Sequence, residues 1–145
     1  MPAAPPGGRV SPPLDPIPRL PHAAPFLLLD RVLEIGERTG AFLKLVSAAD
    51  PCIGRDGQLP AAFVIEALAQ GGGALLAAQG GGAPAAGYLA AVDDFRMLGP
   101  VRAGDELRVE VEILRNFGGA ILLRGRALVD GELRAEGRIT LKPPR

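Results

Sequence analysis

The chain has 145 residues, which is enough for one compact core and too few for two ordinary domains. Its 16 acidic residues balance its 16 basic residues, so the overall charge favours neither nucleic acid nor an anionic membrane surface as a partner. Cys52 is the only cysteine, which excludes an intramolecular disulfide and argues against a cysteine-based metal site. The cytoplasm is therefore the compartment we expect.

The N-terminal segment is rich in proline. Its first 21 residues contain eight prolines and no apolar run, which excludes a secretory signal. This composition predicts a disordered tail over residues 1–19, followed by a single domain over residues 20–145. No later stretch stays apolar for the roughly 20 residues of a membrane span without interruption by glycine, so we expect no span and a soluble protein.

Two short strands are expected at the start of the domain. Residues 30–35 read as a strand, residues 36–40 as a turn, and residues 41–46 as a second strand that pairs with the first. A loop is predicted over residues 47–58.

A long helix should follow. Pro60 suits the first turn of a helix, and residues 61–79 continue with Ala, Leu and Gln and hardly any polar face, which is typical of a buried helix. The glycines at 71–73 weaken it by about 1 kcal/mol each relative to Ala. Close approach of a sheet or a ligand to the bare backbone would account for them.

The second half of the chain alternates with the period of a strand. In residues 106–113 and again in residues 132–141, apolar residues occupy one face and mainly charged residues the other, and Asp130-Gly131 is a two-residue hairpin signal. One helix and about five or six antiparallel strands predict an α+β fold, in which a curved sheet wraps around the helix.

Glu66 is the one residue of the predicted helix whose placement demands an explanation, because it is the only charged residue between Asp56 and Asp93. A carboxylate taken into an apolar interior must find a partner, take up a proton or line a cavity that water or substrate reaches. Functional sites often have this form. Equally, Glu66 could face a wet groove and merely stabilise the positive end of the helix dipole.

Four motifs carry a resemblance that runs over residues 20–141. They are LPHAAPFLLLDRV at 20–32, IEALAQ at 65–70, DFR at 94–96 and PVRAGDEL at 100–107, with Ala103 where the family usually has Pro. In this order and spacing they resemble the β-hydroxyacyl-acyl-carrier-protein dehydratases. The resemblance implies the hotdog fold, a dimer, and active sites at the dimer interface.

The resemblance also implies roles for individual residues. In this family a histidine from one subunit removes the α-proton of a 3-hydroxyacyl thioester, and a helix glutamate from the other protonates the departing hydroxyl. Glu66 occupies the glutamate position, and Ala61 stands where a helix-start N–H polarises the thioester carbonyl. No cofactor and no metal are expected.

The family's catalytic histidine is missing. Its Gly-His-Phe-Pro-Gly segment corresponds here to residues 51–55, which places Cys52 at the histidine position. A free thiol has a pKa of about 8.5 and is better known as a nucleophile than as a base for a carbon acid. More often a cysteine at such a position is a small buried packing residue. His22 is the only histidine and belongs to a motif that active relatives also carry, so we expect a structural role for it, with replacement of the missing base as the alternative.

The loop over residues 51–60 also resembles dehydratase-like proteins of aryl-polyene clusters, which lack the same histidine. This resemblance suggests a companion subunit that supplies Glu66 to a mixed dimer with an active hotdog dehydratase. The expected partners are thioesters of acyl-carrier protein or coenzyme A. The alternative to the mixed dimer is a homodimer with weak or no activity. Two further functions stay open: an acyl thioesterase that uses Glu66, and a non-catalytic subunit that binds acyl-carrier protein.

Overall fold

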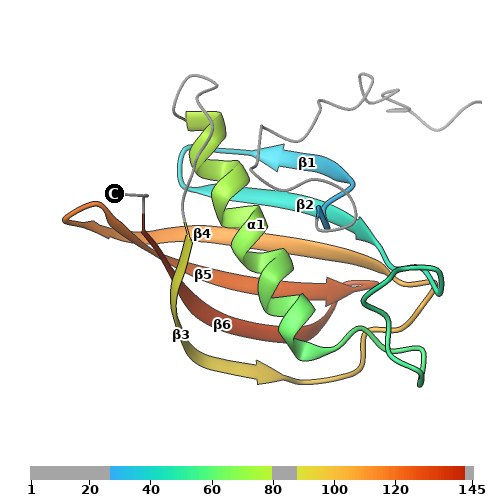
Figure 1. The fold of residues 1–145 in the computed structure, drawn as a ribbon. Coiled ribbons are helices and arrows are strands. Elements are labelled where there is room, and N and C mark those ends of the chain that lie inside the picture. The colour runs from blue at the N-terminus through green and yellow to red at the C-terminus, as the bar shows by residue number, and fades with distance from the viewer. Residues whose placement is uncertain (1–26, 80–87, 143–145) are drawn as a thin grey trace, which may run out of the picture.

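The computed structural model describes residues 27–79 and 88–142. The tail expected over residues 1–19 and His22 lie outside the described residues. Within them, one helix lies across one face of a six-stranded sheet (Figure 1).

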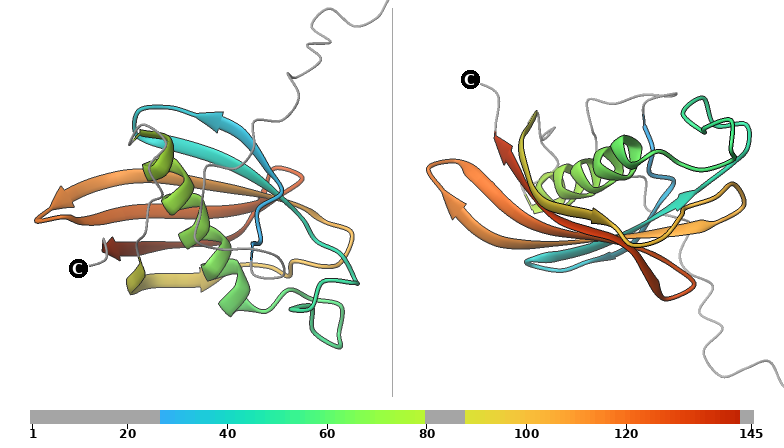
Figure 2. Two further views of the ribbon diagram at one scale, coloured as in Figure 1. Left: turned by 45° about the horizontal axis from the view of Figure 1, so that its top comes forward. Right: turned by 90° about the horizontal axis from the view of Figure 1, so that it is seen from below.

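The elements follow each other in the order in which they were expected. They are β1 (Arg31–Ile35), β2 (Thr39–Leu45), α1 (Ala61–Gln79), β3 (Tyr88–Met97), β4 (Glu106–Phe117), β5 (Ala120–Val129) and β6 (Glu132–Lys142). The sheet has the strand order β1-β2-β4-β5-β6-β3, and every neighbouring pair is antiparallel. Seen from below, the sheet curves around α1 (Figure 2). This arrangement confirms the hotdog fold that the sequence predicted.

The turns of the sheet follow from local residue chemistry. Asp130 and Gly131 both have positive φ, 50° and 78°, as a two-residue hairpin of type I′ requires. The first turn is shorter than the sequence suggested. The Gly36 N–H donates to the Thr39 carbonyl at 2.7 Å, so β2 already begins at Thr39.

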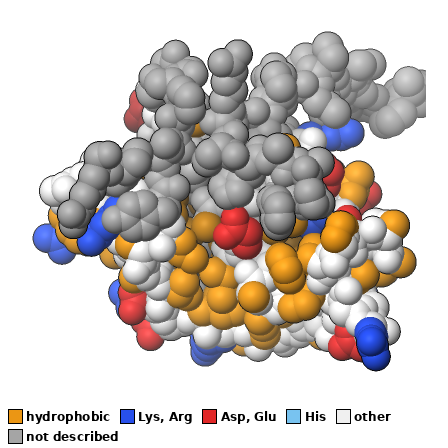
Figure 3. All heavy atoms as spheres, in the orientation of Figure 1, with side chains coloured by type: hydrophobic (Ala, Val, Ile, Leu, Met, Phe, Trp, Pro, Cys, Tyr) orange, Lys and Arg blue, Asp and Glu red, His pale blue; other side chains and the backbone are white. Residues whose placement is uncertain are grey.

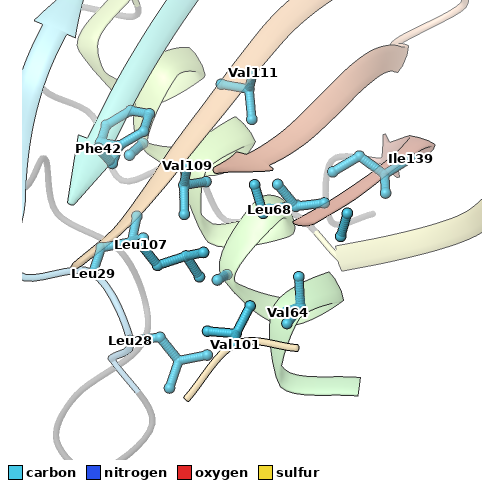
Figure 4. Close-up of a cluster of buried hydrophobic side chains, with 14 of the residues drawn as sticks. Leu28, Leu29, Phe42, Val64, Leu68, Val101, Leu107, Val109, Val111 and Ile139 are labelled. Atoms are coloured by element: carbon cyan, nitrogen blue, oxygen red, sulfur yellow. The ribbon is translucent and has the colours of Figure 1, made fainter. Parts of the chain in front are cut away.

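The core fills the space between α1 and the sheet. Of the four apolar residues of β4 that were expected on one face, Leu107, Val109 and Val111 are buried and Ile113 is half-buried against the core. They pack with side chains of the helix such as Leu68 (Figure 4). Because the alternation of β4 has period two, its charged residues are turned to the outer face of the sheet.

Two glycines let α1 approach the sheet closely. A Cβ added at Gly71 would lie 3.2 Å from Val109 and 3.3 Å from Phe42, and one added at Gly72 would lie 3.0 Å from Leu141. The explanation by close approach of a sheet is thus confirmed for Gly71 and Gly72. By length and composition alone, α1 could cross a membrane, but half of its apolar stretch is buried inside the domain, as in the core helix of a folded protein.

The edge strand β3 contains a bulge. Asp93 pairs with Arg138 and Arg96 with Glu136, so two residues of β3 oppose one residue of β6, and Asp94 has a φ of 52°. The bulge turns Phe95 toward the core, against which it packs. Other apolar side chains of this strand and of the residue after it are exposed, namely Leu89, Val92, Met97 and Leu98.

The close packing at Gly72 generates a stability prediction. Gly72→Leu should lower the free energy of unfolding by about 1–3 kcal/mol, because overpacking against β5 and β6 outweighs the gain in helix propensity. Ala78→Leu places the same side chain at an exposed position of α1 and should change stability by less than about 0.5 kcal/mol. Urea unfolding at matched protein concentration measures both. A more stable Gly72→Leu protein would contradict the close approach.

Candidate functional site

The loop before α1 is held by the segment that follows β3. The Leu59 N–H donates to the Val101 carbonyl at 2.8 Å, and the Ala103 N–H donates to the Gly57 carbonyl at 2.8 Å. An isolated β-bridge joins Gln58 to Arg102. Backbone hydrogen bonds of this kind fix where the helix begins.

The turn at residues 102–105 is itself stabilised by an acidic side chain. Asp105 Oδ2 accepts the Arg102 N–H at 2.7 Å, and Gly104 has a φ of 96°, a conformation that suits glycine. The Gly104 N–H and the Asp105 carbonyl then bond to the backbone of Val46. The turn motif of the dehydratases therefore acts as a clamp on both ends of the loop at 47–59.

An open groove of about 980 Å³ lies at the start of α1. The loop contributes Arg55, Asp56 and Gln58 to it, and the segment after β3 contributes Leu98. Ala61, the first residue of the helix, lines the groove and is exposed. The first N–H groups of a helix have no acceptor within the helix, so this end of α1 presents donors and a partial positive charge.

Glu66 lies in the second turn of α1 and is half-buried. Its Oε1 accepts a hydrogen bond from Gln70 Nε2 at 3.0 Å. Gln70 is only 1% exposed, and its own Oε1 accepts the backbone N–H of Leu28 at 2.8 Å. Glu66 is thus connected through Gln70 to the segment before β1, which explains how its carboxylate is accommodated among apolar residues.

Cys52 lies in the loop and is also half-buried. It packs against the hydrophobic core, and it is not among the residues that line the groove at the start of α1. The structure therefore places Ala61 in the groove, Glu66 further along the helix beside Gln70, and Cys52 against the core. The catalytic and substrate-binding roles assigned to these three residues stay predictions.

Sequence reasoning missed an ion pair that holds the loop. Lys44 is 4% exposed, and its Nζ lies 3.2 Å from Asp50 Oδ2. The same carboxylate oxygen accepts the Ser47 N–H at 2.9 Å. A lysine on the strand face that buries Phe42 and Val46 was the available signal, because a charge at such a position needs a partner.

Within residues 27–79 and 88–142, no group of three or more His, Cys, Asp or Glu side chains could hold a metal ion.

The outer face of the sheet carries exposed ion pairs. In one of them, a guanidinium nitrogen of Arg124 lies 3.9 Å from Oε2 of Glu112. These pairs are typical of a solvated sheet face.

Comparison with known proteins decides the family. A family model described as ApeP-like, ApeP dehydratase, matches residues 15–145. The chain belongs to the ApeP-like dehydratase family.

Curated relatives and a solved structure agree with membership of the ApeP-like family. The 3-hydroxyacyl-[acyl-carrier-protein] dehydratase FabZ of Thermomicrobium roseum is 41% identical over 129 residues, covering 83% of this chain and 84% of that protein. FabZ of Vibrio cholerae is 42% identical over 124 residues, covering 79% of each. The dehydratase heterocomplex ApeI:P from Xenorhabdus doucetiae superposes with a TM-score of 0.79 at 25% identity, covering 87% of this chain and 88% of that one. The chain is a hotdog protein of the FabZ and ApeP dehydratase type.

The Lys44–Asp50 pair generates a second prediction. Asp50→Ala leaves a buried ammonium group without its carboxylate, so we expect the free energy of unfolding to fall by about 1–3 kcal/mol. Glu112→Ala, which breaks the exposed pair with Arg124, should cost less than about 1 kcal/mol. Urea unfolding of both variants measures the difference. Equal losses would show that the pair does not anchor the loop.

Proposed function

We propose that this chain is the histidine-lacking subunit of a mixed hotdog dimer. In the cytoplasm, this dimer dehydrates 3-hydroxyacyl groups carried as thioesters on acyl-carrier protein. The observation that carries the proposal is Glu66, which is held by Gln70 in an otherwise apolar helix, while the loop at 47–59 contains no histidine. The names of the FabZ relatives support the substrate class, and the ApeI:P heterocomplex supports a mixed assembly. The further proposal of a role in aryl-polyene biosynthesis rests on the resemblance of the loop at 51–60.

The proposed reaction divides its proton transfers between two chains. A histidine of the partner removes the α-proton, and Glu66 gives a proton to the departing 3-hydroxyl, which leaves as water as the carbon–carbon double bond forms. The N–H groups at the start of α1, beginning with Ala61, hydrogen-bond the thioester oxygen as negative charge develops on it. Glu66 then regains a proton from solvent, and the histidine releases the one that it took.

Cys52 is proposed to stand at the position of the missing histidine and to leave one of the two composite sites inactive. Its half-buried place against the core supports the role of a packing residue. In a mixed dimer, this chain thus contributes Glu66 to the productive site, while its own loop faces the partner's glutamate in a site that has no base.

The partner is proposed to cover α1 and the edge strand β3. An edge strand leaves backbone groups unpaired, and β3 also exposes Leu89, Val92 and Met97. On the face that carries α1, apolar side chains gather over the lower half of the molecule in Figure 3. A second hotdog subunit paired along β3 would bury these side chains and extend the sheet.

The test of the proposed function uses a partner subunit that has no dehydratase activity by itself. A histidine-bearing FabZ-type subunit from the same genome, with its own helix glutamate changed to glutamine, is co-purified with this chain through two different tags. We expect this mixed dimer to dehydrate 3-hydroxybutyryl-acyl-carrier protein, followed by the absorbance of the enoyl thioester. Glu66→Gln in this chain should then lower turnover by about 10²-fold or more, because it removes a general acid.

The matched control is Glu112→Gln, an exposed glutamate on the outer face of the sheet, which should leave turnover unchanged. Full activity of the Glu66→Gln mixed dimer would overturn the proposal. Hydrolysis of acyl-coenzyme A by this chain alone would instead establish a thioesterase, and binding of acyl-carrier protein with neither reaction would establish a non-catalytic subunit.

A substitution at Cys52 tests why the homodimer is expected to have little or no dehydratase activity. Cys52→His should raise turnover of 3-hydroxybutyryl thioesters by the homodimer at least tenfold, since a positioned general base contributes roughly 10²–10⁴-fold. The same change combined with Pro51→Gly and Arg55→Gly gives the loop the small residues of the FabZ motif. Cys52→Ser is the control. A folded triple variant without activity would show that Cys52 does not stand at the histidine position.

A further inference from the structure

Charged residues on the outer face of the sheet are matched between neighbouring strands. In the strands that the structure describes, five pairs of charged residues stand directly opposite each other and join an acidic to a basic residue: Glu112 with Arg124, Glu110 with Arg126, Arg126 with Glu136, Arg96 with Glu136, and Asp93 with Arg138. Opposite charges in directly opposed positions stabilise antiparallel strands. This face therefore follows a pattern of alternating charge.

One pair departs from this pattern. Arg124 of β5 stands directly opposite Arg138 of β6, and like charges in such positions destabilise a sheet. Arg138 donates a hydrogen bond to Asp94 on its other side. Nη1 of Arg124, in contrast, lies 3.9 Å from Oε2 of Glu112, which is too far for a hydrogen bond. The side chain of Arg124 is 54% exposed, so its N–H donors are open to a ligand.

The like-charged pair lines an open hollow of about 710 Å³ beside the bulge of β3. Three guanidinium groups line this hollow, those of Arg96, Arg124 and Arg138, together with two carboxylates, those of Asp94 and Glu136. The acidic neighbour of Arg124 on β4 is not among the lining residues. The hollow therefore has an excess of positive charge.

The bulge of β3 fixes the acidic side of the hollow. Asp94 has a φ of 52°, a conformation that is uncommon outside glycine and that its surroundings have to hold. A Cβ added at Gly137 would lie 2.9 Å from the Cα of Phe95, so the bare backbone of β6 gives the bulge its room. Because β6 lies between β5 and β3, the carboxylate of Asp94 approaches Arg138 from the side away from Arg124. It does not separate the two arginines.

We propose that Arg124 and Arg138, with Arg96 beside them, form a binding site for a phosphate group. A phosphate between the two opposed guanidinium groups accepts hydrogen bonds from both, because each guanidinium presents a planar fork of donors that matches phosphate oxygens. Its negative charge offsets the repulsion between Arg124 and Arg138. The ligand is either free phosphate or a phosphate ester of a small molecule.

This site is separate from the groove at the start of α1. It lies on the outer face of the sheet, whereas α1 and Glu66 lie on the inner face. A subunit that pairs along the edge of β3 extends the sheet and leaves its outer face open. The phosphate site therefore does not rest on the proposed function.

The first experiment titrates the full chain with inorganic phosphate at constant ionic strength, with chloride as the balancing anion. In nitrogen-15 NMR spectra, the Nε–H signals of Arg124 and Arg138 should shift and saturate, with half-saturation at about 1 mM or below. The Nε–H signal of Arg126, which stands between two glutamates on the same face, is the internal control and should stay in place. Equal shifts at Arg126, or shifts that do not saturate, would overturn the proposal.

Matched variants separate a built site from general association of anions with the surface. Arg124→Gln should raise the half-saturating phosphate concentration at least tenfold, because it removes charge-assisted hydrogen bonds. Without phosphate, its melting temperature should equal or exceed that of the native protein, since a like-charge contact is lost. Arg126→Gln makes the same change of charge and should keep the native half-saturation. Equal weakening of phosphate binding in both variants would contradict the site.

A second titration distinguishes the two sources of the phosphate group. Coenzyme A, which carries a phosphate ester, is compared with inorganic phosphate on the native protein and on Arg124→Gln. Tighter binding of coenzyme A that is lost in Arg124→Gln supports a phosphate ester as the ligand, and tighter binding of inorganic phosphate that is lost in the same variant supports free phosphate. Binding of neither by the folded native protein overturns the proposal and leaves the proposed function untouched.

Discussion

The contact between α1 and the concave face of the sheet is the constraint on which the rest of the structure depends. Gly71 and Gly72 leave no side chain at the point of closest approach, so the side chains of Phe42, Val109 and Leu141 lie directly against the backbone of the helix. Packing of this density fixes both the distance of α1 from the sheet and the rotation of α1 about its own axis. The rotation decides which residues meet the core, and it leaves Glu66 half-buried beside Gln70.

A second set of contacts fixes the end of the helix where the groove lies. The turn at 102–105 bonds to Val46 on one side of the loop and to Gly57 on the other, and the Lys44–Asp50 pair holds the part between them. These contacts are mostly backbone hydrogen bonds, which depend little on the identity of the side chains. A chain with this clamp can therefore change the side chains of the loop and keep the same fold.

The sequence predicted the features that are encoded over short distances. The bounds of α1 at Ala61 and Gln79 were predicted because Pro60 begins the helix and its composition is uniform, and the hairpin at Asp130-Gly131 was predicted from its turn chemistry. The period of β4 identified its buried face. The resemblance to the dehydratases supplied the fold family, which composition alone had limited to one helix and an antiparallel sheet.

Features that depend on distant partners were not predicted. The pairing of Lys44 with Asp50 depends on how a loop folds back on a strand, and the bond from Gln70 to Leu28 joins residues on either side of the first two strands. The bulge at Asp94 places a residue other than glycine at positive φ, where the pairing of β3 with β6 shifts register. The sequence identifies such residues as buried polar groups or as departures from a pattern, but it does not show which residues they pair with.

The position of β3 in the sheet also bears on how the chain folds. Within its own chain this strand pairs only with β6, which is synthesised after β4 and β5, although β3 precedes all three. The hairpins that join β4, β5 and β6 involve neighbouring segments and can form early, whereas β3 must wait for the last of them. During that interval a strand with several apolar side chains has no neighbour, so the nascent chain is most prone to aggregate before β6 is in place.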